Sequence, residues 1–189
     1  MRSNAKFPDL EIIDGYGYIQ IPMMGTVTMS SLKEVGGQFY LSGNLTGCDL
    51  PLVSKVCCST SPVYHSEGMG AFAITLQSKS LNLPELLHVG GEGLFINQAT
   101  GITCDKLQTI DGTLQIKRAT SLSQETFSMK KLETLHGVVF DGLTNFADYT
   151  FFGKFIENEM ITEDNWSVTN CGYNPTYEDM KAGKYTSAE

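Results

Sequence analysis

Apolar residues recur along this chain with a spacing that fits neither a helix nor a simple strand. In the stretch LNLPELLHVGGEGLFI, residues 81–96, apolar side chains come at positions 81, 83, 86 and 89. Two glycines follow, and Leu94 and Ile96 then alternate with polar or outward positions. Steps of two, three and three residues match neither the helical period nor strict alternation. The same pattern returns several times, which indicates an internal repeat.

Six copies of the pattern align on one leucine or valine anchor. Apolar or small residues occupy the positions five before, three before and three after the anchor in all six copies. Successive anchors are 22, 21, 33, 21 and 25 residues apart, and they are Leu10, Leu32, Val53, Leu86, Leu107 and Leu132. A period of twenty-odd residues is the signature of a solenoid. We therefore predict a mainly β fold, a parallel β-solenoid of about six coils whose apolar columns stack into the core.

Each coil contains a corner and a strand after its anchor. The corners read IDG at 13–15, VGG at 35–37, VGG at 89–91, IDG at 110–112 and LHG at 135–137. Glycine suits such corners because it tolerates positive φ. Short alternating strands are predicted at 18–21, 39–41, 72–76, 94–96, 114–116 and 138–140. In the last of these we place Val138 and Phe140 inward, rather than Val139 and Asp141. Successive coils would pair these strands in parallel, about 4.8 Å apart.

The two ends of the repeat differ. Ala147, Tyr149, Phe152 and Phe155 repeat the column offsets, which predicts a partial seventh coil that closes the core with aromatic side chains. We assign residues 1–156 to the solenoid and 157–189 to a C-terminal cap. In this cap Trp166 is expected to pack on the last coil. The run NPTYEDMKAG predicts a short helix, with Asn174 as its cap, Pro175 at its first position and Gly183 at its end.

The N-terminal end has no amphipathic cap. The first coil begins at residue 5, and an open solenoid end exposes apolar core and unpaired strand edge. Residues 1–4 are one candidate plug. We favour a combination of two alternatives to such a plug, namely that the chain continues a longer solenoid and that a partner docks through this N-terminal coil.

The composition limits the classes of partner that this chain is expected to bind. The 189 residues carry a formal net charge of −8, without a basic stripe, which disfavours nucleic acid. No run is long enough to span a membrane, and the first residues lack the apolar region of a secretory signal. The five cysteines show no disulfide framework, and Cys48 and Cys104 fall in core columns.

The third coil carries an insertion, CCSTSPVYHSEGMG at 57–70, in place of corner glycines. Insertions in a solenoid emerge as loops on one face, often the binding face, so Tyr64 and His65 are candidate contacts. The plainer interpretation is a tolerated surface loop. Cys57, Cys58 and His65 would supply three metal ligands at most, and adjacent cysteines rarely chelate one zinc, so we expect no metal.

An enzymatic role has one weak candidate constellation. Asp111 and His136 share the corner column on adjacent coils, and an acid beside a histidine can transfer protons. Corners favour aspartate for conformational reasons alone, which is the structural alternative. A β-helix carbohydrate-active enzyme would gather acids on the outward strand face. None of the outward residues that we expect is acidic, and these are Gln20, Tyr40, Ala73 or Thr75, Phe95, Gln115 and Val139.

The same outward positions favour binding. Tyr40 and Phe95, with Gln20 and Gln115, make a mixed apolar and amide surface of the kind that binds proteins or glycans. The alternative is that the inserted loop covers Phe95.

The runs LKEVGGQFYLSGN, LPELLHVGGEGLFIN and LQTIDGTLQIKRATSL resemble the repeats of leucine-rich-repeat-like surface proteins. They are similar to the receptor L-domain type and to BspA-like proteins of gut bacteria, and the tail WSVTNCGYNPTYEDMKAGKY resembles C-terminal segments of those proteins and their phages. This resemblance implies a right-handed solenoid, adhesive or protein-binding roles and no cofactor. It favours a cell-surface, extracellular or virion location.

We therefore expect a non-enzymatic binding module for adhesion or protein–protein interaction at a cell or virion surface. One alternative is a structural component of a phage or surface assembly that docks through its N-terminal coil. A second is a β-helix carbohydrate-active enzyme that uses Asp111 and His136.

Overall fold

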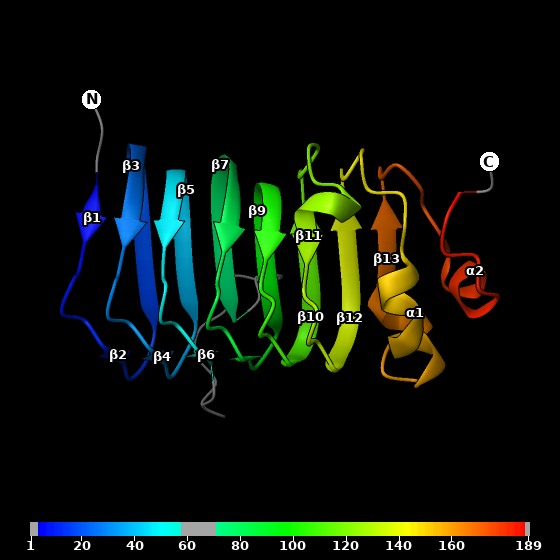
Figure 1. The fold of residues 1–189 in the computed structure, drawn as a ribbon, viewed down its shortest axis with the longest axis horizontal. Coiled ribbons are helices and arrows are strands. Elements are labelled where there is room, and N and C mark those ends of the chain that lie inside the picture. The colour runs from blue at the N-terminus through cyan, green and yellow to red at the C-terminus, as the bar shows by residue number, and fades with distance from the viewer. Residues whose placement is uncertain (1–3, 58–70, 188–189) are drawn as a thin grey trace.

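The computed structural model describes residues 4–57 and 71–187. The chain winds in successive coils, and the strands of neighbouring coils pair in parallel along one long axis (Figure 1). This confirms the predicted mainly β parallel solenoid of about six coils. The longer strands are β3 (Gly17–Thr28), β5 (Phe39–Asp49), β7 (Phe72–Asn82), β9 (Gly93–Thr103), β10 (Thr109–Lys117) and β12 (Thr134–Asp141). The shorter strands are β1 (Ala5–Lys6), β2 (Ile12–Ile13), β4 (Glu34–Val35), β6 (Lys55–Val56), β8 (His88–Val89), β11 (Phe127–Ser128) and β13 (Trp166–Thr169).

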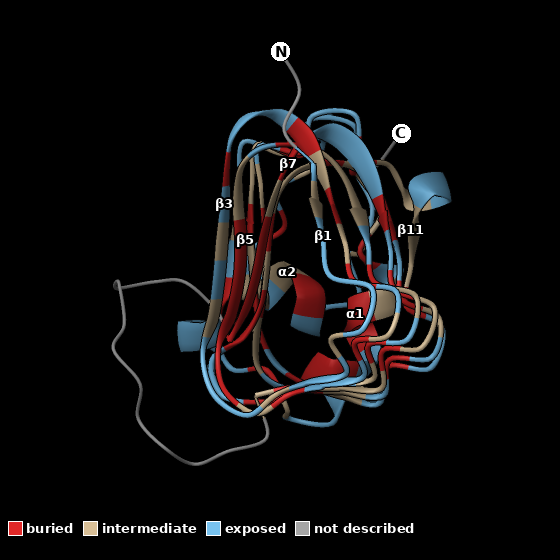
Figure 2. Cartoon of the chain, turned by 90° about the vertical axis from the view of Figure 1, so that its left-hand side faces the viewer, coloured by how far each residue is buried: buried red, intermediate tan, exposed pale blue. Residues whose placement is uncertain are grey.

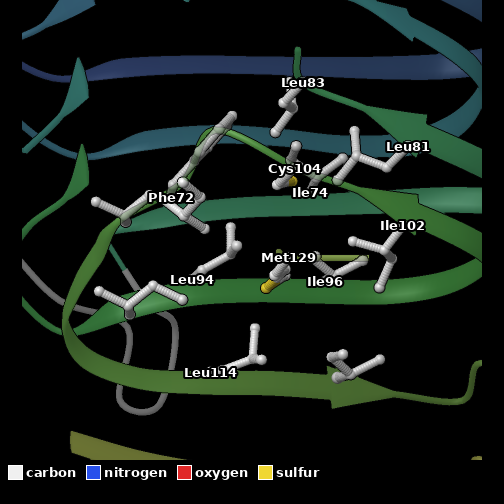
Figure 3. Packing of buried hydrophobic residues seen from close by; sticks show 14 of the residues in the cluster. Phe72, Ile74, Leu81, Leu83, Leu94, Ile96, Ile102, Cys104, Leu114 and Met129 are labelled. Carbon is white, nitrogen blue, oxygen red and sulfur yellow. The ribbon is translucent and has the colours of Figure 1, made fainter. Parts of the chain in front are cut away.

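The apolar columns stack into a continuous core, as the repeat predicts. Phe72 pairs with Leu94, and Leu94 pairs with Leu114, so the inward side chains of three coils lie in one row. Figure 3 shows this row beside a second one of Leu83, Cys104 and Met129. The five anchors from the second to the sixth coil are 0 % exposed, and they are Leu32, Val53, Leu86, Leu107 and Leu132.

The strands are longer than predicted. Pairing of β3 with β5 shifts between Ile21 and Gly25, and pairing of β7 with β9 shifts between Thr75 and Lys79. Such irregularities bend a strand without ending it. One strand can therefore run around a bend, which joins the predicted alternating segment to the first core column of the next coil.

The corner glycines serve a purpose that differs from the expected one. Among the glycines of the two VGG corners, only Gly91 has a positive φ, of 56°. A Cβ on Gly36 would overlap the carbonyl of Asp14, and one on Gly90 would overlap the carbonyl of Cys57. The corners therefore need glycine mainly because the backbones of successive coils approach too closely for a side chain.

The expected seventh coil is a helix instead. Residues Thr150–Glu157 form α1, which buries Phe152 and Phe155 against the last coil. The ring of Phe152 lies 5.4 Å from that of Phe140, so the aromatic closure of the core is as predicted although the backbone is not. β13, in the segment expected to leave the repeat, continues the ladder by pairing with β12. Figure 2 looks along the coils toward this end, and α1 and α2 lie across it.

The short C-terminal helix, α2 (Tyr177–Lys181), forms with a different cap. Thr176, rather than Asn174, accepts a hydrogen bond from the backbone N–H of Asp179, whose side chain bonds back to the N–H of Thr176. Pro175 therefore precedes the helix instead of opening it. Gly183 follows the helix with a φ of 75°, as its predicted role requires. The indole of Trp166 is buried and donates to the carbonyl of Pro175 at 2.8 Å, which ties this tail to β13.

Candidate binding surfaces

The outward strand face is a column of paired residues in the long strands. Tyr40 pairs with Ala73, Ala73 with Phe95, Phe95 with Gln115 and Gln115 with Val139. The outward residue of β7 in this column is therefore Ala73 and not Thr75. The pairing also confirms that Val138 and Phe140 point inward. Gln20 is outward as expected, but it stands opposite Ser42, and the residue opposite Tyr40 is Tyr18. Both Tyr18 and Gln20 are exposed on this face, so the predicted face is confirmed, and Tyr18 is an outward residue that the prediction did not name.

Tyr40 is not an accessible contact. Its side chain is 6 % exposed, and its ring packs edge-on against Tyr16 at 5.6 Å between centroids. Desolvation is the main cause that raises the pKa of the Tyr40 phenol, with smaller contributions from Tyr16 and Glu92. Its hydroxyl has no hydrogen-bond partner among the described residues. Tyr40 therefore acts as a covered side chain, contrary to the expectation that it contributes to an open binding face.

The accessible part of the column lies further along the solenoid. Phe95, Gln115 and Val139 are each half-buried. The ammonium of Lys117 lies 5.9 Å from the centre of the Phe95 ring, so a cation already sits near this aromatic side chain. Phe95 is thus the one aromatic side chain of this segment, and the other exposed aromatic side chain of the outward column is Tyr18 of the first coil.

Asp111 and His136, the candidate catalytic pair, lie on neighbouring coils, but the histidine that Asp111 contacts is a different one. Ile110 pairs with Leu135, which places Asp111 and His136 on neighbouring coils. The Asp111 carboxylate, however, bonds to Nε2 of His88 on the preceding coil, at 2.8 Å. Both groups of this pair are partly exposed, with side-chain exposures of 31 % for His88 and 48 % for Asp111. The contact links two coils at their corner.

The candidates Tyr64 and His65 lie outside the described residues. Over residues 4–57 and 71–187, no cluster of three His, Cys, Asp or Glu side chains is arranged to hold a metal ion. The described cysteine Cys104 is fully buried in its core column, as predicted, and burial raises the pKa of its thiol to about 12.

The first coil carries an exposed apolar surface that sequence reasoning located only in general terms. Seven large hydrophobic side chains are exposed among the described residues, and six of them belong to this coil. Only Leu52, at 44 %, lies elsewhere. The six are Phe7 at 41 %, Ile12 at 54 %, Tyr16 at 47 %, Tyr18 at 52 %, Met23 at 40 % and Met24 at 55 %. We call them the first-coil patch. They share one coil, and exposed apolar groups in such number are a feature of interaction sites.

The backbone of this coil is also unpartnered along one side. β1 pairs with β3 only at Val27 and Thr28, so Gly17–Ile21 of β3 pairs with β5 alone among the described strands. β2 likewise pairs only with β4. In Figure 2 this end of the solenoid faces the viewer, with β1 and β3 in front. A strand edge of this kind presents N–H and C=O groups that another strand can pair with.

The charges on this end are mostly acidic. Residues 4–28 contain Asp9, Glu11 and Asp14 against the single cation Lys6. A cavity of about 130 Å³ adjoins the patch, and its lining combines apolar Ile12 and Val35 with the carboxylates of Asp14 and Glu34, together with Gly36 and Lys55. The end therefore combines apolar groups, unpaired backbone and negative charge.

Comparison with family models, with curated proteins and with solved structures gave no match. Over the part of the chain that the structure describes, no helix has the length and apolar character needed to cross a bilayer.

Proposed function

We propose that this chain is a non-enzymatic protein-interaction module that docks on a partner through its first coil. It would serve as a structural component of a larger assembly, and its resemblance to bacterial surface and phage proteins favours a cell or virion surface. The observation that carries the proposal is the first-coil patch, which holds six of the seven exposed large hydrophobic side chains in the described residues.

Two further features support docking at this end. The unpaired edge of β3 offers main-chain hydrogen bonds, which is how a strand is added to a sheet in many complexes. The opposite end does not offer the same surface, because α1 buries its aromatic side chains over the last coil. The two ends of the solenoid are therefore unlike. Among the described residues, the first coil is where a partner would find several exposed apolar groups together with an open strand edge.

Adhesion through the outward face and enzymatic activity have less support. Adhesion through that face loses Tyr40, which is covered. Its accessible aromatic side chains are Phe95 and Tyr18, and Tyr18 belongs to the first-coil patch. The enzyme hypothesis relies on Asp111, whose carboxylate is engaged by His88. No observation favours either of them over docking through the first coil.

The proposal is tested by selecting a displayed random-peptide library on the whole chain. A Tyr18→Lys/Met24→Lys double variant serves for counter-selection, since both side chains are exposed in the patch. A Leu52→Lys variant is the matched control, because Leu52 is comparably exposed outside the patch. We expect binders that recognise wild type and Leu52→Lys but not the double variant. Binders that keep their affinity for the double variant would place the binding surface elsewhere and contradict the proposal.

A further inference from the structure

We infer that the partner at the first coil is a different protein that presents a strand edge bearing lysine or arginine, and not a second copy of this chain. The inference rests on the proposed function. It comes from the charges of the coils and from the cavity beside Ile12.

The lysine ion pairs between successive described coils share one direction, whereas the His88–Asp111 pair has its acid on the later coil. Four of them join an acid of one coil to a lysine of the next, and the acid always belongs to the earlier coil. They are Glu11–Lys33 at 2.8 Å, Glu34–Lys55 at 4.0 Å, Glu85–Lys106 at 2.7 Å and Asp105–Lys130 at 2.9 Å. As a rule, therefore, a later coil of the described solenoid meets its predecessor with a lysine, and the fourth coil is the exception.

The first coil breaks this rule. At the four positions that carry these lysines in later coils, counted from the anchor Leu10, it has Pro8, Asp9, Glu11 and Ile12. Asp9 and Asp14 are exposed, and neither forms an ion pair in the described part of the chain. In the four lysine pairs, the preceding coil contributes an acid. A partner that contributed acids at the same place would face the carboxylates of the first coil instead of lysines. A partner with lysine or arginine there would complement them.

The same charges oppose a symmetric dimer. A two-fold contact brings one surface against an identical copy of itself. At this end it would gather two sets of Asp9 and Asp14, with one Lys6 from each copy as the only described cation of the coil. Glu11 adds little to this repulsion, because its carboxylate already pairs with Lys33 at 2.8 Å. Like charges in an interface disfavour that pairing. The first-coil patch therefore favours a heterologous partner.

The cavity beside Ile12 fits a basic side chain. The cavity has a volume of about 130 Å³. Its walls offer apolar contacts from Ile12 and Val35 and the carboxylates of Asp14 and Glu34. Lysine and arginine have an apolar stem and a charged head, and they bury the stem on apolar surface while the head meets polar groups. The ammonium of Lys55, which also lines the cavity, lies 4.0 Å from Glu34, and Asp14 forms no ion pair with a described residue. One basic side chain of the partner would occupy this cavity.

The experiment uses the whole chain and two dye-labelled synthetic peptides, one of alternating lysine and valine and one of alternating glutamate and valine. Binding is measured by fluorescence anisotropy at low ionic strength. We expect the lysine–valine peptide to bind and the glutamate–valine peptide not to bind. An Asp9→Asn/Asp14→Asn variant should weaken the lysine–valine complex by about tenfold, since an exposed charge pair contributes up to roughly 1 kcal/mol. The control is Glu163→Gln/Asp164→Asn, which removes the same charge from exposed positions of η2 (Glu163–Asn165) near the other end.

Several results would overturn the inference. Equal binding of both peptides would mean that apolar groups and backbone suffice, and equal weakening by both double variants would mean that only the overall charge attracts the peptide. Absence of binding by the lysine–valine peptide would reject a basic strand. Dimers of the free chain in light scattering, abolished by Tyr18→Lys, would identify the second copy as the occupant. The library selection judges the proposed function separately, because its binders need not be basic.

Discussion

Tyr18 of β3 and Tyr40 of β5 stand opposite each other in the parallel ladder, yet 52 % of Tyr18 is exposed and only 6 % of Tyr40. Equivalent positions on adjacent coils therefore have opposite environments. The same holds for the column three before the anchor, where Phe7 is 41 % exposed and Met29 is fully buried. The repeat places like residues on every coil, but no coil lies before the first one among the described residues to cover them.

Substitutions in the patch should leave the fold intact. We expect Tyr18→Lys or Met24→Lys to change the free energy of unfolding by no more than about 0.5 kcal/mol, because exposed side chains away from caps and cores contribute little. Urea unfolding followed by circular dichroism measures this. A loss above roughly 2 kcal/mol would show that these side chains belong to the core, and the docking surface would then have to be abandoned.

The anchor column should show a graded cost toward the open end. Leu107 is 0 % exposed, so Leu107→Ala should cost about 2–5 kcal/mol of unfolding free energy through lost burial and a cavity. Leu10 holds the same column on the first coil but is only partly buried, so Leu10→Ala should cost less than half as much. Equal costs in urea unfolding would mean that the first coil is as well covered as the inner ones.

Close approach of coils makes one glycine indispensable. Gly93 has a φ of 102°, and a Cβ there would overlap the backbone of Thr113. Gly93→Ala should therefore destabilise the protein by about 2 kcal/mol or more. Gly15 is the matched control, because a Cβ on it would meet no atom within 4 Å. A thermal unfolding midpoint that falls equally for both alanine variants would refute this explanation.

The pH dependence of stability should involve Asp141. Hydrogen bonds from Asn170 and then Thr169 are the main causes that lower the pKa of its carboxyl group. A carboxyl whose pKa is lower in the folded state stabilises the protein above the pKa of the unfolded state, near 4, and loses this contribution as the pH falls through the folded pKa. Asp141→Asn should be less stable than wild type at pH 7, and the difference should shrink by pH 2.5. Thermal unfolding at both values measures it, with Asp164→Asn as the exposed control. A difference that does not depend on pH would assign the loss to geometry instead.

The repeat made the fold predictable because a stacked column tolerates the same residue type on every coil. Alternation also identified the outward face of each strand. It does not say which outward residue of one strand lies opposite which outward residue of the next. Tyr18 and Gln20 satisfy the same alternation, and the count of five residues after Ile13 and Val35 would have selected Tyr18 and Tyr40 together.

The C-terminal end was harder to predict for a physical reason. Steps of three residues between Tyr149, Phe152 and Phe155 fit both the coil columns and one face of a helix. The lack of a corner glycine after them was the signal for the helix that forms. In the tail, Thr176 and Asp179 have the spacing of a capping box, which outweighed Asn174 as a cap.

The burial of Tyr40 could not be read from the columns, because it depends on contacts outside the repeat, such as that with Tyr16. The first-coil patch was predictable in its location but not in its members. Met23 and Met24 precede the first core column of the second coil, and their exposure follows from the bend in β3.

The most direct test of docking through the first coil is backbone amide hydrogen exchange of the whole chain, alone and with a saturating peptide recovered from the library selection. We predict new protection in residues 4–28, strongest along Gly17–Ile21, where β3 has a free edge. Exchange around Phe95, Gln115 and Val139 should stay unchanged. Protection confined to that outward face, with the first coil unaffected, would contradict the account.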